Sequence, residues 1–173
     1  MAVLGASLHR DIEAQRYPLL MYALVPLVAL VLQAWLPRLL RGHVWFDLPL
    51  LVTIYFALGR RSPIQGMMTG AVLGLFEDAL GHHAIGINGI TKTVAGFLAA
   101  SLRIYIEVDN LPIRVILSFL LSLLTSVMFI FINRVLLGFD LEWNLLSEFL
   151  KAVGNTAIAF MLFPLLDRAR VRD

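Results

Sequence analysis

Several side chains capable of acid–base or metal chemistry lie close together between Gly74 and Gly96, in the stretch GLFEDALGHHAIGINGITKTVAG. They are Glu77, Asp78, His82, His83 and Lys92. Imidazole and carboxylate groups both bind zinc, so a metal site is one interpretation. Adjacent histidines on a helix point about 100° apart, however, and the sequence contains no HExxH or comparable helical pair of histidines. We therefore predict no metal, and interpret the histidines as polar residues of a turn.

A catalytic role is disfavoured by the lack of an activated nucleophile in the sequence. A nucleophilic serine needs a base within hydrogen-bond reach, and no serine of this chain lies in a GxSxG elbow. The sequence predicts a protein that is not an enzyme and uses no cofactor. An intramembrane hydrolase built on Glu77, Asp78 and His82 is kept as a third hypothesis.

The composition is that of a membrane protein. Of the 173 residues, 60% are hydrophobic and 15% are charged, whereas about a quarter of the residues of a soluble domain are charged. The net charge is only +2 and no basic run interleaves with aromatic residues, so we expect the lipid bilayer and not nucleic acid as a partner. The chain has no cysteine, which excludes disulfides and thiolate metal sites.

Six apolar segments separated by polar or turn-forming loops predict an all-α bundle of six transmembrane helices. The segments are residues 17–36, 46–59, 64–80, 85–105, 112–137 and 146–166. We expect three regions: an interfacial, cytoplasmic N-terminal segment (1–16), the transmembrane domain (17–166) and a basic cytoplasmic tail (167–173). The second and third segments would rise only about 21 and 25 Å as helices. They must thin the bilayer, extend into their loops or lie inside the bundle.

The third segment carries Gly66, Gly70 and Gly74 at four-residue spacing. This pattern lets two helix backbones approach closely in lipid. Asp78 continues the series and should therefore face a neighbouring helix. In an antiparallel hairpin of the third and fourth segments, with Gly96 as a further packing residue, Asp78 and Lys92 fall at similar depth.

We predict that Asp78 and Lys92 form an ion pair. A lone charge in the membrane costs about 2.5 to 3.5 kcal/mol on insertion scales, so such residues are paired or turned inward. The alternative is that Lys92 extends to the outer surface.

A weakly polar stripe in the last two segments has two interpretations. Helix packing is the plainer one, and a substrate groove is the other. The candidate groove residues are Ser118, Ser122, Thr125, Asn133 and Asn155.

Four aromatic residues in the outer loops suit a membrane interface and are also candidate contacts for a partner. They are Trp45, Phe46, Phe139 and Trp143.

The distribution of basic residues predicts the orientation, because short cytoplasmic loops are enriched in lysine and arginine. With the N-terminus inside, the cytoplasmic segments hold nine: Arg10, Arg16, Arg60, Arg61, Arg103, Arg114, Arg168, Arg170 and Arg172. The opposite side holds four: Arg38, Arg41, Arg134 and Lys151. We therefore expect both termini in the cytoplasm.

Four short motifs follow one another between Phe46 and Ala99. An aspartate and a proline open a short segment, an Ile-Tyr pair follows, a glycine-spaced helix ends in an acidic residue, and a glycine-bounded turn leads into the next helix. These places are held by Asp47, Pro49, Ile54, Tyr55, Gly66, Gly70, Gly74, Asp78 and residues 86–90. Their order and spacing resemble the core of the bacterial rod shape-determining MreD family, and the six-segment pattern agrees.

The resemblance implies a non-enzymatic scaffold in the bacterial inner membrane. Members of that family work with the bitopic protein MreC, the actin-like MreB and the polymerase and transpeptidase pair that builds the lateral cell wall. On this resemblance we expect the chain to bind the single membrane helix and the adjoining periplasmic segment of MreC. The resemblance also implies a fold like that of the substrate-binding subunits of energy-coupling-factor vitamin transporters. Small-molecule transport is therefore the rival hypothesis, which the two short segments bearing Gly or Pro also favour.

Overall fold

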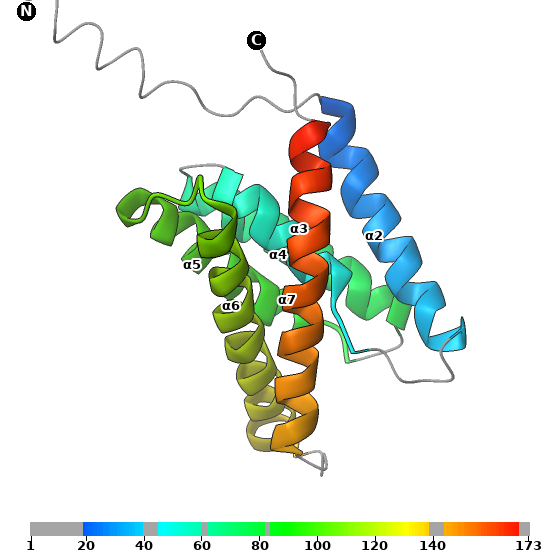
Figure 1. The fold of residues 1–173 in the computed structure, drawn as a ribbon. Helices are drawn as coiled ribbons and strands as arrows, with labels where there is room; N and C mark the ends of the chain where they lie inside the picture. Colours follow the sequence, from blue (N-terminus) through cyan, green and yellow to red (C-terminus); the bar gives the residue numbers. More distant parts are fainter. Residues whose placement is uncertain (1–18, 40–44, 60–61, 82–83, 139–143, 170–173) are drawn as a thin grey trace, which may run out of the picture.

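The computed structural model describes residues 19–39, 45–59, 62–81, 84–138 and 144–169, and these are almost entirely helical (Figure 1). The described residues form six α-helices and one π-helical turn, and contain no strand. The elements are α2 (Leu19–Leu39), α3 (Leu48–Gly59), α4 (Pro63–Gly81), α5 (Ile87–Tyr105), α6 (Leu111–Phe131), η1 (Ile132–Leu136) and α7 (Leu145–Arg168). The all-α prediction is confirmed, and each helix agrees with a predicted segment to within three residues at its ends when η1 is counted with α6.

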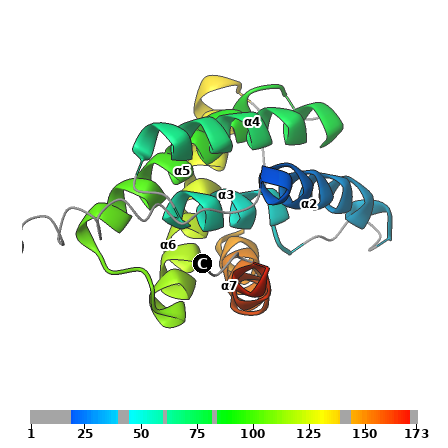
Figure 2. The same cartoon turned by 90° about the horizontal axis from the view of Figure 1, so that it is seen from above.

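The short helix α3 forms the centre of the bundle. Seen from above, it is surrounded by α2, the α4–α5 hairpin, α6 and α7 (Figure 2). Every residue from Pro49 to Gly59 is buried. Twelve helical residues rise only about 18 Å. The structure thus selects one of the three predicted explanations for the short segment, which is burial inside the bundle.

Among the described residues, three helices are long and apolar enough to cross a membrane. These spans are Leu20–Pro37, Leu111–Leu136 and Leu145–Arg168. Helices α4 and α5 have 19 residues each but carry buried charged residues. Figure 1 shows the α4–α5 hairpin tilted steeply against α6 and α7.

Helices α4 and α5 pack through their glycines. A Cβ atom added at Gly66 would meet the carbonyl oxygen of Gly96, and one added at Gly70 would meet that of Lys92. A Cβ atom at Gly74 would likewise meet the carbonyl oxygen of Asn88. Only glycine allows this approach of the two backbones, as expected for small residues at four-residue spacing in a membrane.

The turn between α4 and α5 depends on Gly86. Its φ of 106° lies in the left-handed region, which favours glycine. Gly86 immediately precedes α5, so the chain reverses there and brings the start of α5 beside the end of α4.

Candidate functional site

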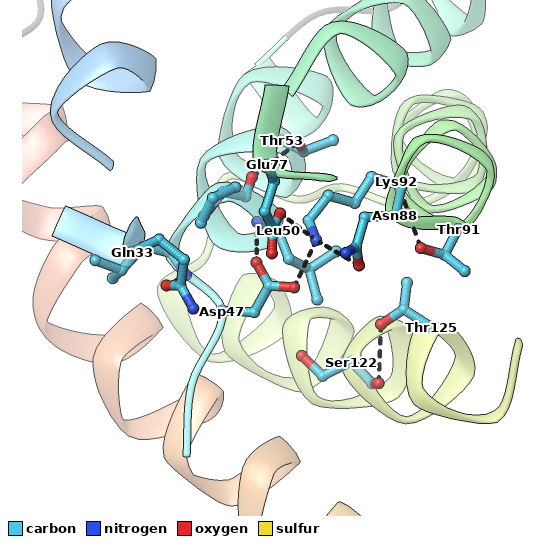
Figure 3. A network of polar contacts seen from close by, with 12 residues as sticks. Gln33, Asp47, Leu50, Thr53, Glu77, Asn88, Thr91, Lys92, Ser122 and Thr125 are labelled. Atoms are coloured by element: carbon cyan, nitrogen blue, oxygen red, sulfur yellow. Dashed lines mark hydrogen bonds and ion pairs between the residues drawn. The ribbon is translucent and has the colours of Figure 1, made fainter. Parts of the chain in front are cut away.

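Lys92 is the centre of a buried ionic cluster (Figure 3). Its side chain is 1% exposed, and its Nζ lies 2.7 Å from Oδ2 of Asp47 and 2.6 Å from Oε2 of Glu77. The cluster joins α5 to the start of α3 and to α4. Burying an ion pair removes both charges from water, and this is tolerated only where the geometry and further hydrogen bonds compensate.

The prediction that Asp78 pairs with Lys92 is wrong, because Lys92 pairs with Asp47 and Glu77 instead. The carboxylate of Asp78 instead accepts hydrogen bonds from Gly86 N at 2.8 Å and from Gly89 N at 3.3 Å. It also accepts from Asn88 twice, from Nδ2 at 2.8 Å and from the backbone N at 3.3 Å. The first amides of a helix lack partners within the helix and attract negative charge, so Asp78 serves as a cap for α5.

Asn88 connects Asp78 to Lys92 indirectly. Its Nδ2 donates to Asp78, while its Oδ1 accepts from Lys92 Nζ at 3.4 Å. The cap of α5 and the ionic cluster are therefore parts of one network, which contains three carboxylates and one ammonium group.

Asp47 links the cluster to the beginning of α3. Its Oδ1 accepts from Leu50 N at 2.8 Å, which caps the helix, while Oδ2 faces Lys92. The side chain of Asp47 is 27% exposed, more than the side chain of Lys92 or Glu77.

The same network reaches the remaining three helices. Gln33 of α2 donates from Nε2 to Phe46 O at 3.1 Å and accepts from Leu48 N at 3.1 Å. The backbone N of Asp47 donates to Asn155 Oδ1 of α7 at 2.7 Å, and Asn155 Nδ2 donates to Ser122 Oγ of α6 at 3.0 Å. A single polar network thus connects all six helices.

A second polar cluster, at the opposite end of the bundle, was not anticipated from the sequence. Arg114 at the start of α6 makes two hydrogen bonds to Asp167 at the end of α7, at 3.2 and 2.8 Å. Tyr55 OH of α3 donates to the same carboxylate at 2.9 Å. Both charges lie at adjoining ends of an antiparallel helix pair, and this position is the signal that could have predicted the contact.

The predicted groove residues lie between helices, and none of them lines the cavity between α6 and α7 that is described below. All five are buried. Ser118 Oγ donates to Arg114 O at 2.9 Å and Thr125 Oγ1 donates to Leu121 O at 3.0 Å. Asn133 Nδ2 donates to Phe129 O at 2.8 Å, and Ser122 bonds Asn155 as described. Of the two interpretations of this stripe, the geometry favours helix packing.

A cavity of about 260 Å³ does occur between α6 and α7, beside the predicted groove. Its lining is mostly apolar and comprises Leu123, Ser126, Val127, Ile130, Leu145, Glu148 and Phe149.

Two of the four predicted aromatic contacts are described by the structure. Trp45 is exposed and Phe46 is partly buried, in the segment that leads into α3. The carbonyl oxygen of Trp45 packs against Gly154 of α7. Phe139 and Trp143 lie outside the described residues, as do His82, His83 and residues 1–16.

The ionic cluster around Lys92 consists of ion pairs and hydrogen bonds between helices. In the part of the chain that the structure describes, no three His, Cys, Asp or Glu side chains converge as metal ligands would. The oxygens and nitrogens around Lys92 face one another across helix interfaces. This arrangement can fix the relative positions of the helices.

These features define an integral membrane protein built as a helical bundle around a buried ionic network. The chain matches the family model described as rod shape-determining protein MreD over residues 14–168, which is nearly its whole length, and it therefore belongs to the MreD family. The family recognised from the motifs is confirmed, and the protein is a rod shape-determining membrane protein. No curated protein and no solved structure matches the chain.

Proposed function

We propose that the protein is a non-enzymatic scaffold of the cell-elongation complex, which binds MreC and so helps to direct lateral peptidoglycan synthesis. The observation that carries this proposal is the network around Lys92. The charged groups in the middle of the chain, which could have done chemistry, are engaged in contacts between helices. They fix a bundle whose outer surface is apolar helix, and such a surface suits packing against another membrane helix.

The remaining partners follow from the resemblance to the family. MreB and the polymerase and transpeptidase of the lateral wall would be reached through MreC, and so contact this protein indirectly. The scaffold would then act by holding MreC in a defined position in the membrane.

We also propose that all six helices cross the inner membrane, with both termini in the cytoplasm. Successive helices run in alternating directions (Figure 1), as the contacts at each end require. Arg114 begins α6 and meets Asp167 at the end of α7, while Gln33 late in α2 meets Leu48 at the start of α3. An even number of alternating helices supports termini on one side, and the excess of basic residues supports the cytoplasmic side. A fold similar to the substrate-binding subunits of energy-coupling-factor transporters is part of the same proposal.

Small-molecule transport is the second candidate function, and α3 is the observation in its favour. Short helices bearing Gly or Pro often mark a binding site near the middle of a transporter, and α3 is short, carries Pro49 in its first turn and lies centrally. Against this function, the five predicted groove residues are buried and hydrogen bonded within the bundle. Neighbouring genes distinguish the two functions, since MreB and MreC genes support scaffolding and a pair of transporter ATPases supports transport.

Co-purification tests the proposed function. The protein is tagged, expressed at its native level, extracted in mild detergent and probed for MreC, with an unrelated single-span membrane protein as the control. We expect MreC to be recovered and the control protein to be absent. Recovery of neither, or of both equally, would contradict specific binding of MreC.

A further inference from the structure

The start of the central helix α3 lies level with the middle of α6 and α7. The backbone N of Asp47 donates to Asn155 Oδ1 at 2.7 Å, and Asn155 Nδ2 donates to Ser122 Oγ at 3.0 Å. Ser122 lies near the middle of the 26-residue span Leu111–Leu136, and Asn155 lies near the middle of α7, which has 24 residues. The ionic cluster that contains Asp47 is therefore far from both ends of these helices.

Helix geometry gives the depth of this cluster in the membrane. At about 1.5 Å per residue, Ser122 lies about 16 Å from Leu111 and Asn155 lies about 20 Å from Arg168. Leu111 and Arg168 mark the cytoplasmic ends of α6 and α7 in the proposed topology. Since the hydrocarbon core of a bilayer is about 30 Å thick, the cluster lies roughly 10 to 14 Å below its outer boundary.

Two stretches of non-helical backbone lie beside the cluster and carry exposed side chains. The first is the segment before α3, in which Trp45 is 42% exposed and the side chain of Asp47 is 27% exposed. The second is the turn before α5, which joins the same polar network through the hydrogen bond from Gly86 N to Asp78 at 2.8 Å. Ile85 of this turn is 78% exposed. Backbone without helical hydrogen bonds is tolerated inside a membrane only where protein buries it or water reaches it, so the exposure of both stretches indicates water.

The outer half of α7 carries a charged pair near the same depth. Lys151 Nζ donates to Glu148 Oε1 at 2.8 Å, and the side chain of Lys151 is 43% exposed. Lys151 lies about one helical turn outward of Asn155. Charged residues inside a membrane face the protein interior or a water-filled space. An exposed ammonium group at this position agrees with water on this side of the bundle.

Helix α6, in contrast, is apolar at this depth and beyond it. The sequence between Arg114 and Arg134 contains no charged residue. Val127 and Phe131 lie further out than Ser122, and each is 57% exposed. Figure 1 shows that α6 and α7 continue past the level at which α2 ends. An exposed apolar run of this kind suits hydrocarbon, so the outer boundary of the membrane beside α6 lies beyond the level of the cluster.

We propose that water from the outer side enters the membrane over the start of α3 and the α4–α5 turn, and forms a hydrated depression that ends at Asp47. Asp47 has the most exposed side chain of the three that form the ion pairs, and it connects Lys92 to this water. The bilayer is thinned on this side of the bundle, whereas lipid of ordinary thickness covers α6. The proposal goes beyond the scaffold function and depends only on the crossing of the membrane by α6 and α7.

Cysteine labelling in lipid nanodiscs tests the proposal, because the chain has no cysteine of its own and both faces of a nanodisc are open to the reagent. Trp45→Cys and Ile85→Cys place a thiol in the proposed depression. Val127→Cys, at a comparably exposed residue further out along α6, is the control. Each variant is treated with a charged maleimide that does not enter hydrocarbon. The labelling rate is divided by the rate in SDS, where every thiol is exposed.

We expect Trp45→Cys and Ile85→Cys to react at least about tenfold faster than Val127→Cys, because a thiol reacts as the thiolate, which forms in water and not in hydrocarbon. Protection of all three variants would show that lipid or protein covers the start of α3, and would overturn the proposal. Labelling of Ile85→Cys alone would also overturn it, since water would then reach the turn but not α3.

Rapid labelling of all three variants would contradict the proposal in a different way. The outer half of α6 would then project into water, and the membrane would end at the level of the cluster without any depression. MreC takes no part in this experiment, so its outcome is independent of the scaffold function.

Discussion

Lys92 and Asp47 form a buried ion pair, with 2.7 Å between Nζ and Oδ2, that fixes the start of the central helix α3 to α5. Glu77 of α4 shares the same ammonium group at 2.6 Å. Since α3 contacts every other helix of the bundle, this pair holds the element around which the others are arranged.

Replacement of Lys92 by Met should destabilise the protein strongly. The methionine keeps the length of the side chain but leaves Asp47 and Glu77 without their cation, and removing one partner of a buried ion pair costs about 3 to 5 kcal/mol. We expect a lower melting temperature in detergent and reduced accumulation in the membrane. Lys151→Met, at a residue whose side chain is 43% exposed, is the control and should cost about 0 to 1 kcal/mol. Similar melting temperatures for both variants would show that the cluster is unimportant for stability.

Asp78→Asn should loosen the start of α5 in particular. The amide replaces an acceptor oxygen by a donor opposite the backbone N–H groups of Gly86 and Gly89, and removes the negative charge at the helix N-terminus. Loss of a helix cap typically costs about 0.5 to 2 kcal/mol. Hydrogen exchange should become faster for the first turn of α5 and stay unchanged in α6. Uniformly faster exchange throughout the bundle would argue against a local capping role.

Gly70→Ala should separate α4 from α5. The new methyl group would meet the carbonyl carbon and oxygen of Lys92, which belong to the backbone and cannot turn away. Overpacking of this kind typically costs about 1 to 3 kcal/mol. The measurement is the melting temperature in detergent, with Ala79→Leu at an exposed position of α4 as the control. A Gly70→Ala variant as stable as the parent would mean that the backbones can separate without loss.

Topology reporters should place both termini in the cytoplasm. The reason is the nine-to-four distribution of basic residues, which lie in short loops or in the terminal turns of the helices, where the positive-inside rule applies. Alkaline phosphatase fused after Arg172 should therefore be inactive, and a cytoplasmic reporter at the same position active. Phosphatase activity at this site would invert the proposed orientation of every loop.

The local pattern in the sequence was sufficient to predict which face of α4 is packed. Gly66, Gly70 and Gly74 lie on one face because their spacing nearly matches the turn of a helix, and this depends on no other segment. The inward position of Asp78 follows from the same spacing. Helix lengths and positions were predictable for a similar reason, because they depend on runs of apolar residues.

The partners of the charged residues were not predictable by the same means. The pairing of Asp78 with Lys92 was predicted because the two residues lie at similar depth in a two-helix hairpin. The backbone amides at the start of α5 bind Asp78 instead. Of the two actual partners of Lys92, Glu77 is the neighbour of Asp78 in the sequence. The other partner, Asp47, comes from the start of α3, and no helical periodicity relates it to Lys92.

The sequence could not predict whether the hydroxyl groups of the predicted groove face a ligand. A hydroxyl group in an apolar helix can face a ligand or bond to the carbonyl oxygen one turn before it, and the two cases have the same spacing. Ser118 and Thr125 bond to the carbonyl oxygen one turn before them. Ser126 of the same helix is among the residues that line a cavity.

The most direct test of the central claim is an exchange of charges between Glu77 and Lys92, followed by measurement of the MreC recovered per molecule of protein. The claim is that the ionic cluster is structural and that the bundle it holds works by binding a partner. We expect Glu77→Lys and Lys92→Glu each to lower accumulation of the protein, and the double variant to restore part of it together with MreC recovery and rod-shaped growth. The combination of Asp78→Lys with Lys92→Glu is the control and should restore nothing, because Asp78 faces the amides of α5. A Glu77/Lys92 double variant that accumulates as the parent does but recovers no MreC and gives round cells would contradict the account, since the cluster would then have a chemical role of its own.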